Sequence, residues 1–299
     1  MQENRKTFEN RLKQKVSETE LQRVMFVYDL VKSAHRNQFR DDKETRYFEH
    51  PRQGCLVLMD ELHCYDPKLI IAFLLHDVGE DTALLGDLRK SYEDWKKEAA
   101  FRLNIIYPEI TPIVIALTKP AIDNKLFTTK EDSYKFYLTG LQTNEQVMLL
   151  KMVDKLINSR NSLNATDKKK TQEQIKELTN DYLPIFSKFV SGSGKYKQEF
   201  EHVWKALHKT LDLLKKKFQE TETAYEVEWT WDNFSPDSFE APFSSATIRY
   251  VSSEKLVEDL TGFYKPNAKH SEVKKVLISL EEYENLEKEG GKKKIKTFN

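Results

Sequence analysis

The sequence predicts an all-α helical bundle of about eight or nine helices, followed by a small α+β or partly irregular C-terminal extension. Three observations support this fold class. Charged residues make up 32% of the chain and only 9 of its 299 residues are glycine, a composition that favours long solvated helices. Apolar residues recur every three or four positions from about residue 21 to residue 218. After Thr223 the spacing changes to a period of two, which is typical of strands.

The first helices follow from local patterns. Segment 1–20 is predicted to be helical or frayed. In segment 21–34, three- and four-residue steps give one apolar stripe, made of Leu21, Val24, Met25, Tyr28, Val31 and Ala34. Asp66 is a favourable helix cap, and Pro67 suits the first helical position. The helix that follows has no polar face over 69–75, so we expect it at the centre of the bundle.

The later helices are predicted from the same periodicity. Segment 87–104 is amphipathic, and we expect Trp95 and Phe101 to face inward. The remaining helices are expected at 112–117, 145–156, 167–190 and 196–218. The last two are rich in Lys and Glu and should be outer helices. The run 168–170, three lysines, is expected to be a solvated face rather than a phosphate-binding one.

The predicted helical domain spans 21–220, and the predicted extension spans 221–299. Strands are expected in the extension at 224–231, 246–251 and 273–279, with a helix at 281–289. Segment 233–245 carries two prolines and is expected to be a loop. The tail 290–294 should be frayed.

Overall composition limits the classes of partner. Lys plus Arg and Asp plus Glu are both 48, so there is no global basic field and no nucleic-acid partner is expected. Cys55 and Cys64 form no CxxC motif, which favours reduced thiols. The N-terminus is polar and the longest apolar run, 69–75, is far too short to cross a bilayer. We therefore expect a cytoplasmic protein without a membrane partner.

A cluster of ionisable residues begins where the apolar run ends, at His76 and Asp77. Burying unpaired charge is expensive, and a bound cation compensates for it. With His50 upstream and Asp154 downstream, the donors suit a divalent ion such as Mn, Fe, Zn or Mg. Adjacent helical residues point about 100° apart, so two neighbours reach one ion only near a helix end. Gly79 falls where such an end is expected.

Each of these residues also has an ordinary structural explanation. A histidine at the end of an apolar helix is usually a satisfied core residue, and an aspartate there is often a turn residue. The joint spacing of the four makes coincidence a poor explanation of the set. His35 is different, because it continues an inward stripe, and we expect it to pack or to support the site rather than to bind the ion.

Four segments resemble the motifs of the HD-superfamily guanosine alarmone hydrolases. This family includes the hydrolase halves of Rel/Spo-type enzymes and the small stand-alone (p)ppGpp 3′-pyrophosphohydrolases. Residues 34–40 and 47–51 resemble its "AHxGQxR…YxxHP" opening, 74–82 resemble "LLHDVVEDT", 115–119 resemble "VxxVTK" and 149–160 resemble "LIKLADRLHNMR". The resemblance covers roughly residues 24–161.

The resemblance implies a metal site, two catalytic carboxylates and a set of substrate contacts. The implied metal ligands are His50, His76, Asp77 and Asp154, and the ion is typically Mn²⁺. The implied catalytic carboxylates, which position or deprotonate the attacking water, are Glu80 and Asp81. The implied substrate contacts are Arg40, Asn158 and Lys151. The implied substrate is a small nucleotide, (p)ppGpp, which would be converted to GDP or GTP and pyrophosphate.

Departures from the motifs keep other functions open. Asn37 stands where the family has glycine, Ile157 replaces a histidine, and the loop 41–46 is acidic. An HD phosphohydrolase with a different substrate, such as NADPH, a cyclic dinucleotide or a deoxynucleotide, is one alternative. A non-catalytic scaffold is another. It would bind a protein partner, or a second copy of the chain, through the aromatic-rich extension 221–299, which contains Trp229, Trp231, Phe234, Phe239 and Phe243.

Overall fold

A computed structural model describes residues 3–40, 42–87, 91–120, 127, 129–165, 167–217, 221–230, 245–251 and 270–298. The chain divides into two compact units, Met1–Lys217 and Phe218–Asn299. Within the described ranges, none of the helices combines the length and the apolar character that crossing a bilayer requires.

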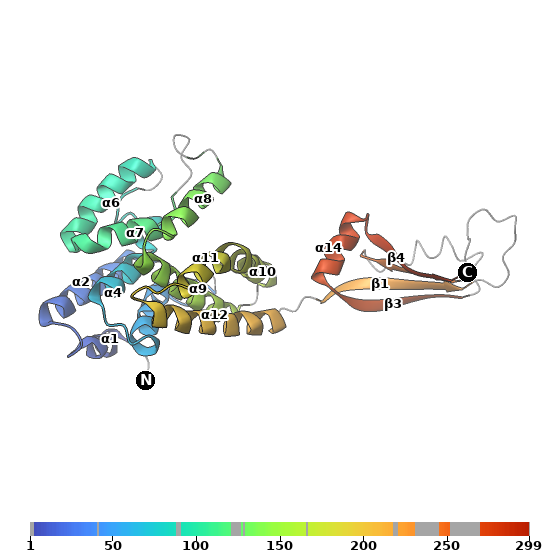
Figure 1. Cartoon of the computed structure of the whole chain (residues 1–299), viewed down its shortest axis with the longest axis horizontal. Coiled ribbons are helices and arrows are strands. Elements are labelled where there is room, and N and C mark those ends of the chain that lie inside the picture. The colour runs from blue at the N-terminus through green and yellow to red at the C-terminus, as the bar shows by residue number, and fades with distance from the viewer. Residues whose placement is uncertain are drawn as a thin grey trace. The chain divides into compact units, whose positions relative to one another are not determined.

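The first unit is all-helical in its regular elements (Figure 1). They are, in order, α1 (Arg5–Leu12), α2 (Glu18–Ala34), α3 (Glu49–Leu56), η1 (Val57–Glu61), α4 (Pro67–Leu75), α5 (Val78–Asp81), α6 (Tyr92–Ile106), η2 (Pro108–Ile110), α7 (Thr111–Leu117), α8 (Lys130–Leu141), α9 (Glu145–Ser162), α10 (Lys168–Glu177), η3 (Leu178–Tyr182), α11 (Leu183–Val190) and α12 (Lys197–Lys217). Elements η1 and η3 are π-helical turns, and η2 is a 3₁₀ turn.

The predicted central helix is α4. Asp66 caps it by accepting a hydrogen bond from the backbone N–H of Lys68, and Pro67 occupies its first turn. All seven residues from Leu69 to Leu75 are fully buried, which is why this helix has no polar face. It packs against α2, whose predicted stripe is buried up to Val31, and against α3.

Helix α9 joins the other layers of the helical unit. It packs most extensively against α12, and it also contacts α3, α4, α7, α8, α10 and α11 (Figure 1). Most of its apolar residues are buried around its whole circumference, from Val147 to Ile157. A helix buried in this way holds any polar side chain it carries in a fixed position, and Asp154 is such a side chain.

Two predictions for the helical unit need correction. Trp95 of α6 is buried as predicted, but Phe101 is 69% exposed. The two residues are six positions apart on one helix, and six steps of about 100° turn the side chain well away from the first face. The structure also contains twelve α-helices, α1–α12, within this unit's described residues, more than the eight or nine predicted. The excess arises partly because predicted continuous segments are interrupted, as at η3 within 167–190.

The second unit contains an antiparallel sheet with strand order β3-β1-β2-β4. Its elements are β1 (Thr221–Thr230), β2 (Ser245–Tyr250), β3 (His270–Ser279), α14 (Leu280–Lys288) and β4 (Lys292–Phe298). Val227 of β1 lies opposite Ile248 of β2 and Val273 of β3. Leu286 of α14 packs with Ile278 and Ala224 of the sheet, which ties the helix to one sheet face.

The predicted fold class, an all-α helical bundle with a small α+β extension, is confirmed. The frayed tail is wrong, because β4 pairs with β2 at the edge of the sheet. Lysine-rich edge strands are common, since the charges discourage pairing with other chains. The predicted loop 233–245 lies outside the described residues except for Ser245, the first residue of β2. Four aromatic residues of the extension, Trp231, Phe234, Phe239 and Phe243, also lie outside the described residues.

Candidate metal centre

His76 lies where the central helix breaks. Helix α4 ends at Leu75 and α5 begins at Val78, so His76 and Asp77 occupy the two positions between them. The Nδ1–H of His76 donates to the backbone carbonyl of Phe73 at 2.7 Å. This bond fixes the ring and leaves Nε2 as the nitrogen that faces Asp77 and Asp154. That Nε2 is buried and has no hydrogen-bond partner of adequate geometry among the described residues.

The other predicted ligands converge on the same point. His50, in the first turn of α3, is 2% exposed, and its Nε2 lies 3.2 Å from Asp154 Oδ1 and 3.4 Å from Asp77 Oδ2. His76 Nε2 lies 3.1 Å from Asp77 Oδ1 and 3.8 Å from Asp154 Oδ1. One donor atom each from His50, His76 and Asp154 fall within 4.8 Å of one another.

These distances fit a shared divalent ion. Ligand bonds from nitrogen and oxygen to such ions are about 2.1 Å, so two ligands at right angles lie about 3.0 Å apart. The four imidazole–carboxylate separations run from 3.1 to 3.8 Å. The unpartnered Nε2 of His76 and the mixture of imidazole and carboxylate donors both suit Mn, Fe, Zn or Mg. The residues present therefore fit the metal that the sequence predicted, without selecting its identity.

Protonation in the metal-free chain is unequal between the two histidines. Burial alone would lower the pKa of His76, but Asp77 and Asp154 outweigh it and raise that pKa to about 10. Burial keeps the pKa of His50 below its ordinary value. Burial also opposes ionisation of Asp77 and Asp154, yet the neighbouring His76 and Lys151 cations hold the pKa of both carboxyls below the usual range. The protonated His76 and the Lys151 ammonium together therefore balance the charges of the two carboxylates.

Asp77 is oriented by Tyr47. The Tyr47 hydroxyl donates to Asp77 Oδ2 at 2.8 Å, and burial raises its pKa, so that it remains a donor. The Tyr47 ring stacks on His35, with centroids 4.7 Å apart. His35 is 1% exposed and packs against this ring, so the packing role, one of its two predicted alternatives, is confirmed. Such contacts hold the Asp77 carboxylate, a predicted ligand, in place.

The two predicted catalytic carboxylates lie on α5, directly after the ligands. Glu80 is exposed at the surface, but the surrounding protein still withdraws its carboxyl from part of the solvent and raises its pKa to about 7. The backbone N–H of Lys119 donates to Glu80 Oε1 at 2.6 Å and holds it in place. Asp81 is also exposed, and its backbone carbonyl accepts a hydrogen bond from the Gln38 side chain at 2.7 Å.

The predicted substrate contacts are joined to the ligand cluster through Asn158. Its Nδ2 donates to Asp154 Oδ1 at 2.7 Å, while its Oδ1 accepts from Arg40 Nη2 at 3.0 Å. Residues 118 positions apart in the chain thus meet at one amide. Lys151 is differently placed, because its Nζ lies 2.8 Å from Asp154 Oδ2 and its side chain is only 12% exposed. Its role in substrate binding stays a prediction.

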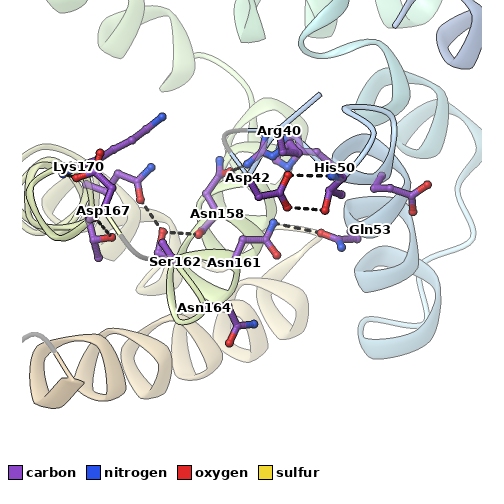
Figure 2. Close-up of a pocket in the computed structure, with 15 residues that line it drawn as sticks. Arg40, Asp42, His50, Gln53, Asn158, Asn161, Ser162, Asn164, Asp167 and Lys170 are labelled. Carbon is purple, nitrogen blue, oxygen red and sulfur yellow. Dashed lines mark hydrogen bonds between the residues drawn. The ribbon is translucent and has the colours of Figure 1, made fainter. Parts of the chain in front are cut away.

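A cavity of about 580 Å³ adjoins the cluster, with His50, Arg40 and Asn158 in its wall (Figure 2). The Arg40 guanidinium has five N–H donors, of which one is directed at Asn158, so others remain for phosphoryl oxygens. A phosphorylated compound in this cavity would lie against both Arg40 and His50, one of the candidate metal ligands.

Tyr47 and Gln38 had no predicted role in the site. Both lie within the segments that resemble the family motifs, at residues 34–40 and 47–51. The motif match marks these positions, but it does not say which residues their side chains contact. Tyr47 contacts Asp77 thirty residues away, and Gln38 contacts the Asp81 backbone forty-three residues away. Contacts at such separations depend on the tertiary fold.

Comparisons with known proteins add little to this geometry. No protein-family model matches the chain, and no curated protein matches it. Several solved structures match, among them one described as a metazoan SpoT ortholog that hydrolyses ppGpp and plays a role in starvation responses. It is 23% identical, and the match covers 61% of this chain and 94% of that chain with a TM-score of 0.41. A likeness of this degree carries no argument about activity. Any proposal about activity therefore rests on the side-chain geometry described above.

Proposed function

We propose that this chain is a metal-dependent phosphohydrolase of the HD type. The single observation that carries the proposal is the buried convergence of His50, His76 and Asp154, with an unpartnered imidazole nitrogen directed into it. Isolated buried charge is costly, and a cation offsets that cost. A divalent ion bound there supplies Lewis-acid chemistry, polarising a phosphoryl oxygen and lowering the pKa of water.

The chain's own residues supply the remaining parts of the reaction. Arg40 offers a planar set of donors to the phosphoryl oxygens, and the Asn158 amide orients it. Glu80 has a pKa of about 7, close to the optimum for a group that takes a proton from water at neutral pH. The hydrogen bond from Lys119 positions that carboxylate. Attack of water on phosphorus would form a new P–O bond and break the P–O bond to the leaving oxygen, while Glu80 would take a proton from the water and return it to that oxygen.

The substrate that we propose is (p)ppGpp, hydrolysed to GDP or GTP and pyrophosphate, with Mn²⁺ as the ion. Support for this finer assignment comes from the motif resemblance, in which Arg40, Asn158 and the ligand set all stand at matching positions. The same resemblance supports Asp81 as the second catalytic carboxylate and Lys151 as a further substrate contact. NADPH, cyclic dinucleotides and deoxynucleotides are the compounds against which it must be compared.

The test is Mn²⁺-dependent release of pyrophosphate from ppGpp by the wild type and by Asp77→Ala. Removal of a residue needed to activate the nucleophile should lower turnover at least about a hundredfold. His202→Ala is the matched control, because His202 is exposed and lies outside the cluster. Equal turnover by wild type and Asp77→Ala, or turnover that persists in excess chelator, would refute the proposal. Turnover of only another compound in the panel would refute the substrate and leave the reaction class intact.

A further inference from the structure

Helix α5, which carries both proposed catalytic carboxylates, is too short to hold its own shape. It is a single turn of four residues, Val78–Asp81. An isolated helix of this length is unstable in water, because its few hydrogen bonds do not offset the cost of ordering the backbone. The last carbonyl groups of any helix also lack partners within it. Contacts from other segments must therefore set the position of α5.

One connection, between α2 and α3, holds both ends of this turn. At the start of the turn, the Tyr47 hydroxyl donates to the side chain of Asp77 at 2.8 Å. At its end, Gln38 Nε2 donates to the backbone carbonyl of Asp81 at 2.7 Å. The two donor residues are themselves joined, since the backbone N–H of Tyr47 donates to the carbonyl of Gln38 at 3.0 Å. The connection thus grips α5 at two points.

His35 fixes the orientation of the Gln38 amide. A backbone carbonyl only accepts hydrogen bonds, so the NH₂ group of Gln38 must face Asp81 and its Oε1 must point the other way. That oxygen lies 2.5 Å from His35 Nδ1, which must therefore carry the hydrogen. The His35 ring is 1% exposed and stacks on Tyr47, so this donor is held in place.

We propose that Gln38 is a positioning residue: oriented by His35, it holds the end of α5 and thereby keeps Glu80 in place. This inference rests on the proposed function, which gives Glu80 the proton transfer. Releasing the end of α5 should cost rate rather than substrate affinity, because Arg40 and the candidate metal ligands belong to other contacts. A displacement of about 1 Å at a reacting group can lower a rate about a hundredfold.

The first test measures amide hydrogen exchange in the metal-free chain. The backbone N–H groups of Glu80, Asp81 and Thr82 donate to carbonyls one turn earlier, so their exchange reports the opening of α5. Gln38→Met keeps the length of the side chain and removes the donor, and it should accelerate exchange at these amides at least about fivefold. Gln22→Met is the matched control, because Gln22 is an exposed glutamine of α2, and it should leave the rates within about twofold. Equal rates in Gln38→Met and wild type would overturn the proposal.

A double-variant comparison tests the part played by His35. His35→Phe keeps a flat ring to stack on Tyr47 but has no N–H to offer Gln38. It should accelerate exchange at the same amides. The double variant His35→Phe/Gln38→Met should exchange no more than about twofold faster than the faster single variant, since both changes break one chain of hydrogen bonds. Effects that multiply would show that His35 does not act through Gln38.

Kinetics give a readout that general destabilisation would not reproduce. Gln38→Met should lower kcat for ppGpp at least about tenfold and leave KM within about twofold. Gln38→Glu should show the same loss, because an ionised carboxylate cannot donate to the Asp81 carbonyl. An unchanged kcat in both variants would refute the positioning role.

The two proposals can fail separately. If exchange in α5 depends on Gln38 but wild type does not hydrolyse ppGpp, the proposed function alone fails. If wild type hydrolyses ppGpp and neither exchange nor kcat responds to Gln38→Met, the positioning role alone fails.

Discussion

Adding Mn²⁺ to the metal-free chain should raise its thermal unfolding temperature, and His76→Ala should abolish the increase. A ligand that binds only the folded state at a hundred times its Kd stabilises by about 2.7 kcal/mol. For a domain of this size, 1 kcal/mol shifts the unfolding temperature by about 2–4 °C, which gives an increase of about 5 to 10 °C. The imidazole supplies one of the converging donor atoms, so its removal should leave the metal without effect.

The size of this increase should depend on pH. Because the pKa of His76 is about 10 without metal, the ion must displace a proton from Nε2, and each pH unit below 10 weakens the apparent affinity about tenfold. The increase should therefore be larger at pH 8.5 than at pH 6.5 at equal Mn²⁺. The stability of the metal-free fold depends on pH in the opposite direction. The contribution of protonated His76 to the free energy of unfolding is complete below the ordinary pKa of 6.5 and is lost as pH rises through about 10.

The assay is circular dichroism melting with and without Mn²⁺, with His202→Ala as the control variant because His202 is an exposed histidine outside the ligand cluster. Its metal response should equal that of the wild type. An equal response in His76→Ala, or a wild-type response that shrinks as pH rises from 6.5 to 8.5, would refute the assignment of His76 as a ligand.

Three further substitutions test other contacts of the site. Gly79→Ala should destabilise by about 1–3 kcal/mol in urea unfolding, because an added Cβ would lie 2.8 Å from Trp95 Cζ2; wild-type stability would contradict the close packing. Glu80→Gln should remove the rise of kcat/KM with pH through about 7, since the wild-type carboxyl must lose its proton to act as a base; an unchanged profile would exclude it from that role. Lys151→Met should cost about 3–5 kcal/mol without metal, because it removes the nearest cation from the buried Asp154 carboxylate, and Mn²⁺ should reduce that loss; an equal loss with and without Mn²⁺ would argue against Asp154 as a ligand.

Elements set by local chemistry were predictable from the sequence. The cap at Asp66, the proline at position 67 and the buried stretch 69–75 involve residues close in the chain, and each is present. The predicted inward orientation of Phe101 was wrong. The amphipathic pattern of segment 87–104 indicates a helix, but it does not determine which face each residue near the end of the helix occupies. The strand over 292–298 was missed, because its lysines suggested a solvated tail and its pairing partner is a distant strand.

The candidate site was predictable in its membership and not in its geometry. Motif positions identified His50 and Asp154, and the structure brings them within 3.2 Å. The hydrogen bond from the Tyr47 hydroxyl to Asp77 could not be predicted from local sequence, because thirty residues separate the two side chains. This contact depends on how the loop before α3 packs.

Donors supplied by α3, by the break between α4 and α5, and by α9 tie the candidate centre to the integrity of the whole bundle. Proteolytic cleavage of the chain between those segments would leave every candidate ligand chemically intact, but it would interrupt the backbone that holds these side chains in position. Occupancy by a cation would in turn couple the opening of three helices, so that their amide protons should exchange with solvent as one cooperative group rather than separately.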